Sequence, residues 1–245
     1  MFNPFDADHP SVFVALADTP ASKRLHHRLR YQVYCQKLAY EDPARFPDGE
    51  ERDHYDEHAV QFVAYDRRRG DWAGTLRLVR PGPAGLPMTS VTGLASAIKQ
   101  LAKLERVLEI SRMCVNAPSP SAESGRQGDT ADATLRNAPL VFFSLVRASV
   151  AYAFQAGISH LAFLTTPSLL RLLRRLGIQH MPAGDPCMHR GLRYPRVLDV
   201  VEEFRRLIER VDDHPLGSEV PIEPYQAFSS MVSGLRHQKA QVSFG

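Results

Sequence analysis

Alternating and helically spaced apolar residues divide the chain into predicted strands and helices. Residues 59–65 (AVQFVAY) and 72–79 (WAGTLRLV) alternate along two runs joined by a short turn, which predicts a β-hairpin. Residues 20–38 instead place apolar side chains at helical spacing, and Thr19 can cap that helix with Pro20 in its first turn. The first third of the chain therefore mixes both kinds of element.

The remaining elements follow from the same reasoning. Strands are expected at 11–17, 104–115 and 158–166, with two weak strands in 179–199, and helices near 94–104, 139–157, 167–176 and 201–211. Residues 116–134 are rich in Ser, Gly, Asp and Ala and predict a long loop. We expect one domain over residues 11–211, a loose arm at 1–10 and a C-terminal extension at 212–245. The order of elements is that of a mixed α/β domain whose first strands are largely antiparallel.

One predicted strand carries charge in an apolar setting. In the stretch 104–115 (LERVLEISRMCV), simple alternation puts Glu109 and Ser111 on one face and Ile110 and Arg112 on the other. A charge is not buried without a partner, so this strand indicates either a functional site or a structural ion pair.

Composition narrows the class of protein. A chain of 245 residues can bury a full core, and a net charge of +3 with no RNA- or DNA-binding motif does not point to nucleic acid. Three widely spaced cysteines suggest a reducing compartment, so we expect a cytoplasmic protein without disulfides. The most apolar segment, 139–157, has Arg147 at its centre and is expected to be a buried helix, not a transmembrane segment.

Six charged side chains, including the two of the predicted strand 104–115, lie in apolar or turn-rich surroundings and balance in sign. They are Arg30, Asp53, Asp56, Arg77, Glu109 and Arg112. Such a set can bind a small zwitterion, since carboxylates receive an ammonium and an arginine receives a carboxylate. A carboxylate with a raised pKa can also accept a proton.

The order and spacing of these residues resemble the acyl-homoserine-lactone synthases, a branch of the GNAT-like acyltransferases. The matching segments are LRYQVY with Arg30 and Tyr34, then Tyr40, EERDHYD with Asp53 and Asp56, GTLRL with Arg77, and EISR from Glu109 to Arg112. The resemblance implies an α/β fold of the GNAT type, with a mixed, largely antiparallel sheet flanked by helices.

Some details resemble a neighbouring group more closely. Tyr40 stands where the lactone synthases usually have Trp. The segments LAYE at 38–41, FPDG at 46–49 and HRGLRYP at 189–195 look more like the N-acyl amino acid synthases and the acyltransferases associated with PEP-CTERM/exosortase systems.

The resemblance implies transfer of a fatty acyl group from an acyl-carrier-protein or coenzyme A thioester to the amine of an amino acid or similar acceptor. Glu109 is the expected base, and a backbone N–H after the EISR strand is expected to bind the oxyanion. Asp53 and Asp56 would meet the amine, and Arg30 or Arg112 a carboxylate. Other candidate substrate-binding residues are Tyr34, Tyr40, Arg77 (which we expect to bridge the acids), Ser111, Phe142, Phe143 and Phe163. The phenylalanines, with Phe62, can line an acyl tunnel or simply belong to the core.

The sequence features that could bind a carrier protein or coenzyme A are weaker. Arg171, Arg174 and Arg175 lie on one predicted helix and can dock an acidic carrier protein, or they form a solvated helix face. Residues 125–129 (GRQGD) are a poor match to a glycine-rich pyrophosphate loop. The donor thioester is expected as a co-substrate, with no permanently bound cofactor.

Metal and thiol chemistry are the weaker interpretations. His54 and His58 have helical spacing but no third ligand nearby, so we expect no metal. Cys114 beside the EISR strand is expected to be a small apolar residue and not a nucleophile.

Two other functions stay open. One is an acyl-homoserine-lactone synthase, which differs in its acceptor. The other is a non-catalytic module that binds an acyl ligand or a carrier protein. This module would be favoured if Glu109 formed a closed pair with Arg112 and no cleft reached it.

Overall fold

A computed structural model describes residues 11–83, 85–116 and 129–231. Its strands are β1 (Val12–Leu16), β2 (Ala59–Asp66), β3 (Asp71–Val79), β4 (Val107–Val115), β5 (His160–Thr165), β6 (Met181–Pro182), β7 (Cys187–Met188), β8 (Leu192–Asp199) and β9 (Gln226–Ala227). Its α-helices are α1 (Pro20–Arg30), α2 (Ser96–Lys103), α3 (Asp129–Gln155), α4 (Pro167–Arg175) and α5 (Val200–Phe204). Wider π-helical turns follow α1 as η1 (Tyr31–Lys37) and α5 as η6 (Arg205–Glu209), and short 3-10 turns include η3 (His54–His58) and η4 (Pro87–Ser90).

The strands form one mixed sheet in the order β6-β8-β5-β4-β3-β2-β1-β9, with β7 paired on β8. The β2–β3 hairpin is present where alternation predicts it, and β1 to β4 pair antiparallel. Strands β4 and β5 are parallel neighbours in the middle of the sheet. The predicted fold class, a largely antiparallel sheet flanked by helices, is confirmed.

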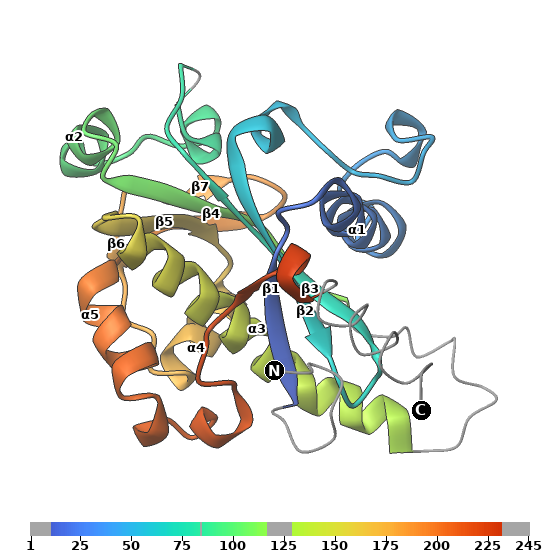
Figure 1. The fold of residues 1–245 in the computed structure, drawn as a ribbon. Coiled ribbons are helices and arrows are strands. Elements are labelled where there is room, and N and C mark those ends of the chain that lie inside the picture. Colours follow the sequence, from blue (N-terminus) through green and yellow to red (C-terminus); the bar gives the residue numbers. More distant parts are fainter. Residues whose placement is uncertain (1–10, 84, 117–128, 232–245) are drawn as a thin grey trace.

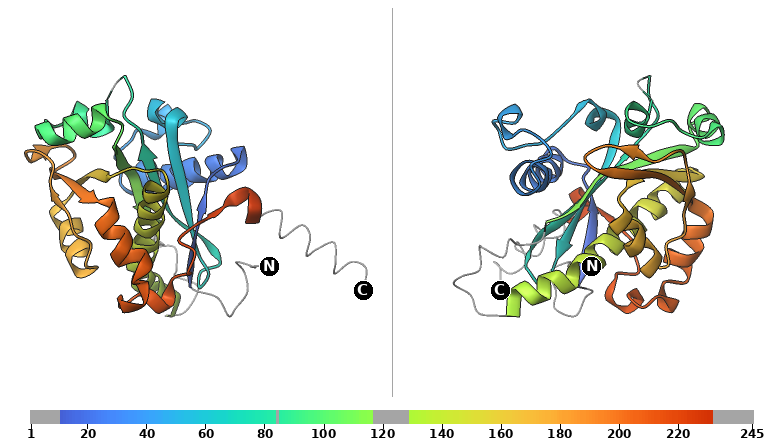
Figure 2. Two further views of the ribbon diagram at one scale, coloured as in Figure 1. Left: turned by 60° about the vertical axis from the view of Figure 1, so that its left-hand side comes forward. Right: turned by 180° about the vertical axis from the view of Figure 1, so that it is seen from behind.

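Helices cover both faces of this sheet (Figures 1 and 2). Helices α3, α4 and α5 pack on one face, where Phe62, Leu76 and Leu161 belong to the main core. Helices α1 and α2 lie on the other face, over two smaller apolar clusters. The predicted charged residues of the site lie on this second face, where Arg30 of α1 contacts the segment before β2.

Helix α3 is the central core helix that the apolar segment predicts. The window Asn137–Gln155 is long and apolar enough to cross a membrane, but 78% of it is buried inside the protein. Arg147, near its middle, donates hydrogen bonds to the carbonyls of Leu207 and Pro221. The helix begins at Asp129, inside the predicted loop 116–134, so that loop ends earlier than expected. Residues 117–128, with most of the candidate pyrophosphate loop, lie outside the described residues.

The predicted helix at 20–38 changes its winding halfway. Thr19 Oγ1 accepts a hydrogen bond from Ser22 N, which confirms the predicted cap. After Arg30 the turns widen to π-helix, which rotates the following side chains relative to an α-helix. Leu38, which helical spacing predicts on the apolar side, is consequently 45% exposed.

The last described elements complete the sheet. Two weak strands were expected in 179–199, and the structure has three, because β6 and β7 both pair with β8. Strand β9 lies in the predicted C-terminal extension and pairs parallel with β1. The expected helix at 201–211 is present as α5 and η6.

A tight contact between β3 and α3 gives a test of this arrangement. A Cβ at Gly74 would lie 2.8 Å from Val141 Cγ1 and 3.1 Å from the Cys114 carbonyl oxygen. We expect Gly74→Ala to lower the free energy of unfolding by about 1–3 kcal/mol in urea denaturation. Gly82→Ala is the control, since a Cβ at Gly82 meets no atom within 4 Å. Equal stability of the two variants would contradict the described packing.

Candidate active site

Strand β4 contains one residue more than β3 at the centre of the sheet. The pairing passes from Thr75↔Cys114 to Arg77↔Ser111, so three steps along β4 oppose two along β3. Arg112 lies in this bulge with φ of +48°. A β-bulge re-aims the side chain it carries and is common next to active sites.

The bulge decides which face Arg112 occupies. Simple alternation puts Arg112 beside Ile110, but Ile110 packs toward the α3 core and Arg112 Nη2 lies 3.1 Å from Asp53 Oδ2. Ser111 Oγ accepts a hydrogen bond from Arg77 Nε within the same set of contacts. The predicted separation of Ser111 and Arg112 onto opposite faces is therefore wrong, because the extra residue in β4 breaks the alternation.

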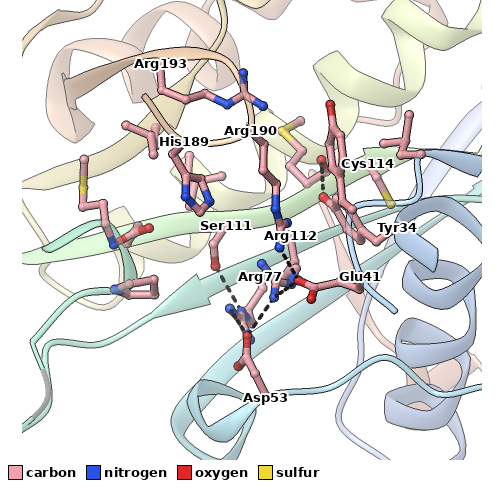
Figure 3. Close-up of a pocket in the computed structure, with 18 of the residues that line it drawn as sticks. Tyr34, Glu41, Asp53, Arg77, Ser111, Arg112, Cys114, His189, Arg190 and Arg193 are labelled. Atoms are coloured by element: carbon pink, nitrogen blue, oxygen red, sulfur yellow. Dashed lines mark hydrogen bonds and ion pairs between the residues drawn. The ribbon is translucent and has the colours of Figure 1, made fainter. Parts of the chain in front are cut away.

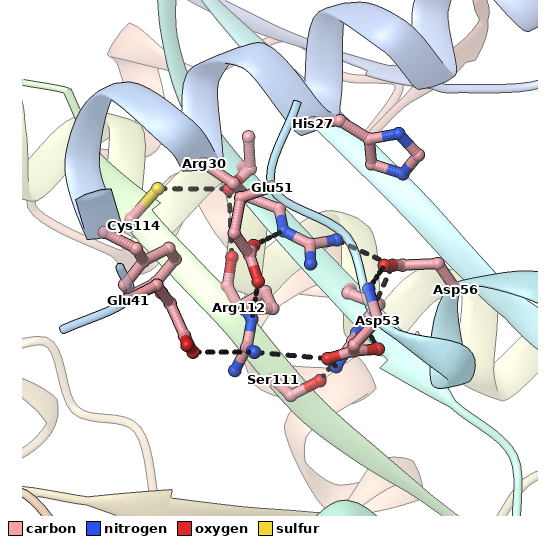
Figure 4. A network of polar contacts seen from close by, with 12 residues as sticks. His27, Arg30, Glu41, Glu51, Asp53, Asp56, Ser111, Arg112 and Cys114 are labelled. Carbon is pink, nitrogen blue, oxygen red and sulfur yellow. Dashed lines mark hydrogen bonds and ion pairs between the residues drawn. The ribbon is translucent and has the colours of Figure 1, made fainter. Parts of the chain in front are cut away.

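A buried ionic network joins α1 to the segment before β2 (Figure 4). The Arg30 guanidinium, fully buried, donates from Nε to Glu51 and from Nη1 to Asp56 Oδ1 at 2.6 Å. Burying an arginine is costly unless its charge is matched by such partners. Arg30 therefore fixes both carboxylates, and with them the loop that contains Asp53.

The other two arginines extend the network to the central strands. Arg77 Nη1 lies 2.6 Å from Asp53 and 2.9 Å from Asp56, which is the bridge expected from the sequence. Arg112 contacts Glu51 Oε1 and Asp53 Oδ2, each at 3.1 Å. Three arginines and three carboxylates thus neutralise one another in a site that is largely shielded from water.

The network keeps its aspartates ionised. Burial alone would raise the pKa of Asp56, but the charges of Arg30 and Arg77 outweigh it and hold that pKa well below its usual range. Burial also raises the pKa of Asp53. The hydrogen bond from Arg77 and the charge of Arg77 lower it by more, so the net shift of this pKa is downward. Neither aspartate is a good proton acceptor near neutral pH.

A cleft of about 630 Å³ opens beside the network (Figure 3). Among the residues predicted from the sequence, its lining includes Tyr34, Tyr40, Asp53, Arg77, Glu109, Ser111 and Arg112. Two predicted substrate contacts, Arg30 and Asp56, are absent from this lining, and their side chains are 0% and 8% exposed. The expectation that Arg30 and Asp56 touch the acceptor is therefore wrong, because they are enclosed between α1 and the sheet.

Glu109 differs from every carboxylate of the network. It is 3% exposed, lines the cleft, and accepts one hydrogen bond from Met88 N at 2.8 Å. Burial raises its pKa to about 8, against the opposing effects of the Met88 N–H, Arg77 and Arg112. Among the described residues no ion pair joins Glu109 to Arg112. The arrangement that would favour a non-catalytic module is therefore not the one observed.

The cleft also contains polar residues that the sequence reasoning did not select. Those with ionisable side chains include Lys37, Glu41, His189, Arg190 and Arg193. Glu41 accepts contacts from both Arg112 and Arg190. For all of them except Lys37, the signal was present in the segments LAYE and HRGLRYP, which were noted only for their resemblance to known acyltransferases.

Strands β4 and β5 stop pairing and diverge beside the cleft. Their ladder runs from Val107↔His160 to Ile110↔Phe163, while β4 continues to Val115. An apolar pocket of about 160 Å³ lies at this divergence and shares Tyr34, Leu164 and residues 110–113 with the cleft. The two spaces therefore meet between the strands, with charged groups on one side and apolar groups on the other.

The predicted tunnel residues are only partly in this pocket. Phe142 and Phe163 line it, together with Val146 from α3. Phe143 does not contribute to its lining and instead stacks on His214, with 4.1 Å between ring centroids. Of the two interpretations given for Phe143, the structure therefore supports the core and not the acyl tunnel, since the turn of α3 directs this ring toward the C-terminal segment.

Tyr34 stands where the two spaces meet. Its hydroxyl donates a hydrogen bond to the Met113 carbonyl at 3.0 Å, and burial raises its pKa above the ordinary value. Its ring packs against Tyr40 and under the Arg112 guanidinium. Tyr34 thus remains a neutral phenol that fixes the backbone of β4 beyond the bulge.

Helix α4 presents its three arginines to solvent. Leu169 and Leu173 of this helix line the apolar pocket, while Arg171, Arg174 and Arg175 are exposed. The helix therefore separates the pocket from a basic outer surface.

Two alternative chemistries find no support in the described residues. No group of three or more His, Cys, Asp or Glu side chains suited to a metal ion occurs within residues 11–83, 85–116 and 137–231. Burial raises the pKa of Cys114 to about 11, and its thiol lies 3.1 Å from Thr75 Oγ1. A thiol with such a pKa is a poor nucleophile at neutral pH.

The raised pKa of Glu109 predicts a pH-dependent cost in stability. The ordinary pKa of 4.5 in the unfolded chain and about 8 in the folded chain mean that wild-type protein loses stability as pH rises from about 4.5 to 8. We expect Glu109→Gln to be more stable than wild type at pH 7, by on the order of 3 kcal/mol, and nearly equal to it at pH 4. Urea denaturation at the two pH values measures this difference, and a pH-independent difference would contradict it.

Comparisons with known proteins agree with this geometry. The model of the acetyltransferase (GNAT) domain family matches residues 29–121. An acyl-homoserine-lactone synthase of Rhizobium radiobacter is 29% identical over 161 residues, which cover 65% of this chain and 69% of that protein. A second acyl-homoserine-lactone synthase, from Vibrio anguillarum, is 25% identical over 162 residues, or 66% of this chain and 76% of that protein.

Solved structures show the same fold. A CoA-dependent acyl-homoserine lactone synthase, BjaI, solved with SAM and isopentyl-CoA, aligns with a TM-score of 0.55 at 20% identity, over 89% of this chain and 93% of its own. TofI, solved with an inhibitor and MTA, aligns with a TM-score of 0.53 at 24% identity, over 78% of this chain and 91% of its own. The chain is therefore an acyltransferase with a GNAT-type fold that resembles the acyl-homoserine-lactone synthases in sequence.

Proposed function

We propose that this protein transfers a fatty acyl group from an acyl-carrier-protein or coenzyme A thioester to the primary amine of an amino acid or a similar small acceptor. The observation that carries this proposal is the position of Glu109. It is a nearly buried carboxyl with a pKa near 8, and it lines the cleft where β4 and β5 diverge. A base with a pKa near the working pH is suited to deprotonate an amine.

The mechanism requires a neutral amine, a base and an oxyanion partner. An acceptor ammonium first releases one proton to solvent. As the nitrogen bonds to the thioester carbon, the ionised Glu109 carboxylate takes a second proton from that nitrogen. The carbonyl oxygen becomes negative in this step, and backbone N–H groups of β4 beyond Ile110 are the proposed donors to it. The C–S bond then breaks, the carbonyl re-forms, and the leaving thiolate receives the proton held by Glu109.

The other cleft residues orient the acceptor. Asp53 is ionised, lines the cleft and is the carboxylate proposed to meet the ammonium before it loses its proton. Arg112 is 22% exposed at its side chain and can approach a substrate, whereas Arg30 acts by holding Glu51 and Asp56 in place. Asp56 therefore positions Arg77 and Arg30 and takes no direct part in the reaction.

The apolar pocket is the proposed site of the acyl chain. Phe142, Val146 and Phe163 surround it with hydrocarbon groups, which suits an alkyl tail. The exposed arginines of α4 are the proposed docking surface for an acidic carrier protein, which would work in the cytoplasm with its thioester as co-substrate. A solvated helix face remains the alternative for these arginines.

A second candidate function is synthesis of an acyl-homoserine lactone. The two curated relatives named above favour it, since both are acyl-homoserine-lactone synthases. It uses the same acyl transfer and differs in the acceptor, which would be S-adenosylmethionine. The head group of the product therefore distinguishes the two functions.

Mass spectrometry of lipid extracts tests both functions together. We expect cells that express the wild-type chain to contain new N-acyl compounds, and cells that express Glu109→Gln to contain at least about 100-fold less, since general acid–base catalysis contributes roughly 10²–10⁴-fold. Glu202→Gln is the matched control, since Glu202 is exposed on α5 and does not line the cleft. An N-acyl amino acid supports the first function and an acyl-homoserine lactone the second. Equal products from wild type and Glu109→Gln would contradict the assigned base.

A further inference from the structure

The hairpin of β7 and β8 borders the cleft, and it contacts the segment that follows η1. Its turn is closed by a hydrogen bond from His189 N to the Gly191 carbonyl at 2.9 Å, and Arg190 and Gly191 both have positive φ. Figure 3 shows His189, Arg190 and Arg193 coming from this segment onto the same wall of the cleft. Three basic side chains therefore face the space that Glu109 borders.

One of these side chains holds the hairpin in place. Arg190 Nη2 lies 2.9 Å from Glu41 Oε1, and its guanidinium lies over the Tyr40 ring at 5.4 Å from the centroid. Glu41 also contacts Arg112 at 3.3 Å, which ties the hairpin to the ionic network. The ionic contacts from Arg190 through Glu41 to Arg112 therefore hold the hairpin beside the cleft.

The charges on this wall do not balance. The three arginines of the network match Glu51, Asp53 and Asp56, and Arg190 matches Glu41. Arg193 has no carboxylate partner within the described part of the chain, where its guanidinium contacts only the Leu192 carbonyl at 3.3 Å. A cation that lines a cleft without a carboxylate partner leaves a net positive wall.

Burial and the excess of positive charge lower the pKa of His189. Burial lowers the pKa of its imidazole first, and Arg190, Arg193 and Arg112 lower it further, with Glu41 opposing them. The imidazole is therefore surrounded mainly by positive charge. An anion bound on this wall would relieve that repulsion.

We propose that the β7–β8 hairpin forms a carboxylate subsite, with Arg193 as the main ligand and His189 and Arg190 beside it, for the carboxylate of a free amino acid acceptor. This inference rests on the proposed acyl transfer and specifies its acceptor. The planar fork of an arginine matches a carboxylate bidentately. With its carboxylate at the hairpin, the acceptor directs its amine toward the wall that contains Asp53 and Glu109.

The subsite gives the enzyme a way to reject uncharged amines. An acceptor whose carboxylate is replaced by a carboxamide leaves Arg193 without its partner, and an unpaired group in a bound complex is costly. A charge-assisted hydrogen bond of this kind changes affinity by about 10- to 100-fold. The preference for the acid over the amide should therefore depend on Arg193.

Isothermal titration calorimetry at pH 7 tests the subsite without any thioester, so its result is independent of acyl transfer. The probes are the twenty L-amino acids, the carboxamide of each one that binds, and S-adenosylmethionine in a separate arm. We expect at least one free amino acid to bind wild-type protein about 10- to 100-fold more tightly than its carboxamide. Arg193→Gln should abolish this preference, and Arg193→Lys should keep part of it, since a lysine retains the charge and loses the fork. Arg205→Gln, an exposed arginine of η6, should behave as wild type.

Three outcomes would overturn the proposal. The first is that no free amino acid binds wild-type protein, including the case in which S-adenosylmethionine alone binds. The second is equal affinity of wild type for the acid and its carboxamide. The third is undiminished acid binding by Arg193→Gln. Loss of product in Glu109→Gln cells would still support acyl transfer in each of these cases, so the two proposals fail separately.

Discussion

Three arginines, two of them fully buried, pair with three carboxylates and determine the geometry of the site. Arg30 comes from α1, Arg77 from β3 and Arg112 from β4, and their partners come from the segment before β2. Removing one member of such a network leaves an unpaired buried charge, at a cost of about 3–5 kcal/mol. The network therefore fixes a helix, a loop and two strands relative to one another, and its own groups are too tightly paired to exchange protons.

The reactive group is the carboxyl that this network leaves out. Glu109 is two residues before Ser111 on the same strand. Its carboxyl accepts a hydrogen bond from the Met88 backbone N–H, whereas the aspartates form ion pairs with arginines. Low solvation without a full ionic partner is what raises the pKa of a carboxyl. Ionised aspartates and a Glu109 that titrates near neutrality thus occupy one cleft, and the divergence of β4 from β5 brings an apolar pocket up to the same place.

Most strands, the hairpin and five of the six members of the network could be predicted from the sequence, because alternation and charge in apolar context are local signals. The sixth member is Glu51, where the sequence analysis had selected Glu109. The side of the sheet that Arg112 occupies could not be predicted, since the bulge depends on how β4 pairs with β3. The winding after Arg30 and the turn of Phe143 toward His214 are likewise set by tertiary packing. Arg193 was missed because the β7–β8 hairpin brings it to the cleft from a distant part of the chain.

The central claim is that Glu109 is a neutral acid at pH 7 and becomes a base just above it. The most direct measurement is an NMR titration of protein labelled with ¹³C at the δ-carboxyl of glutamate, with Glu109→Gln used to assign the signal. We expect one carboxyl to titrate near pH 8, the value to which burial raises its pKa, and to be absent from the variant. A Glu109 signal that titrates near the ordinary pKa of 4.5 would contradict the account.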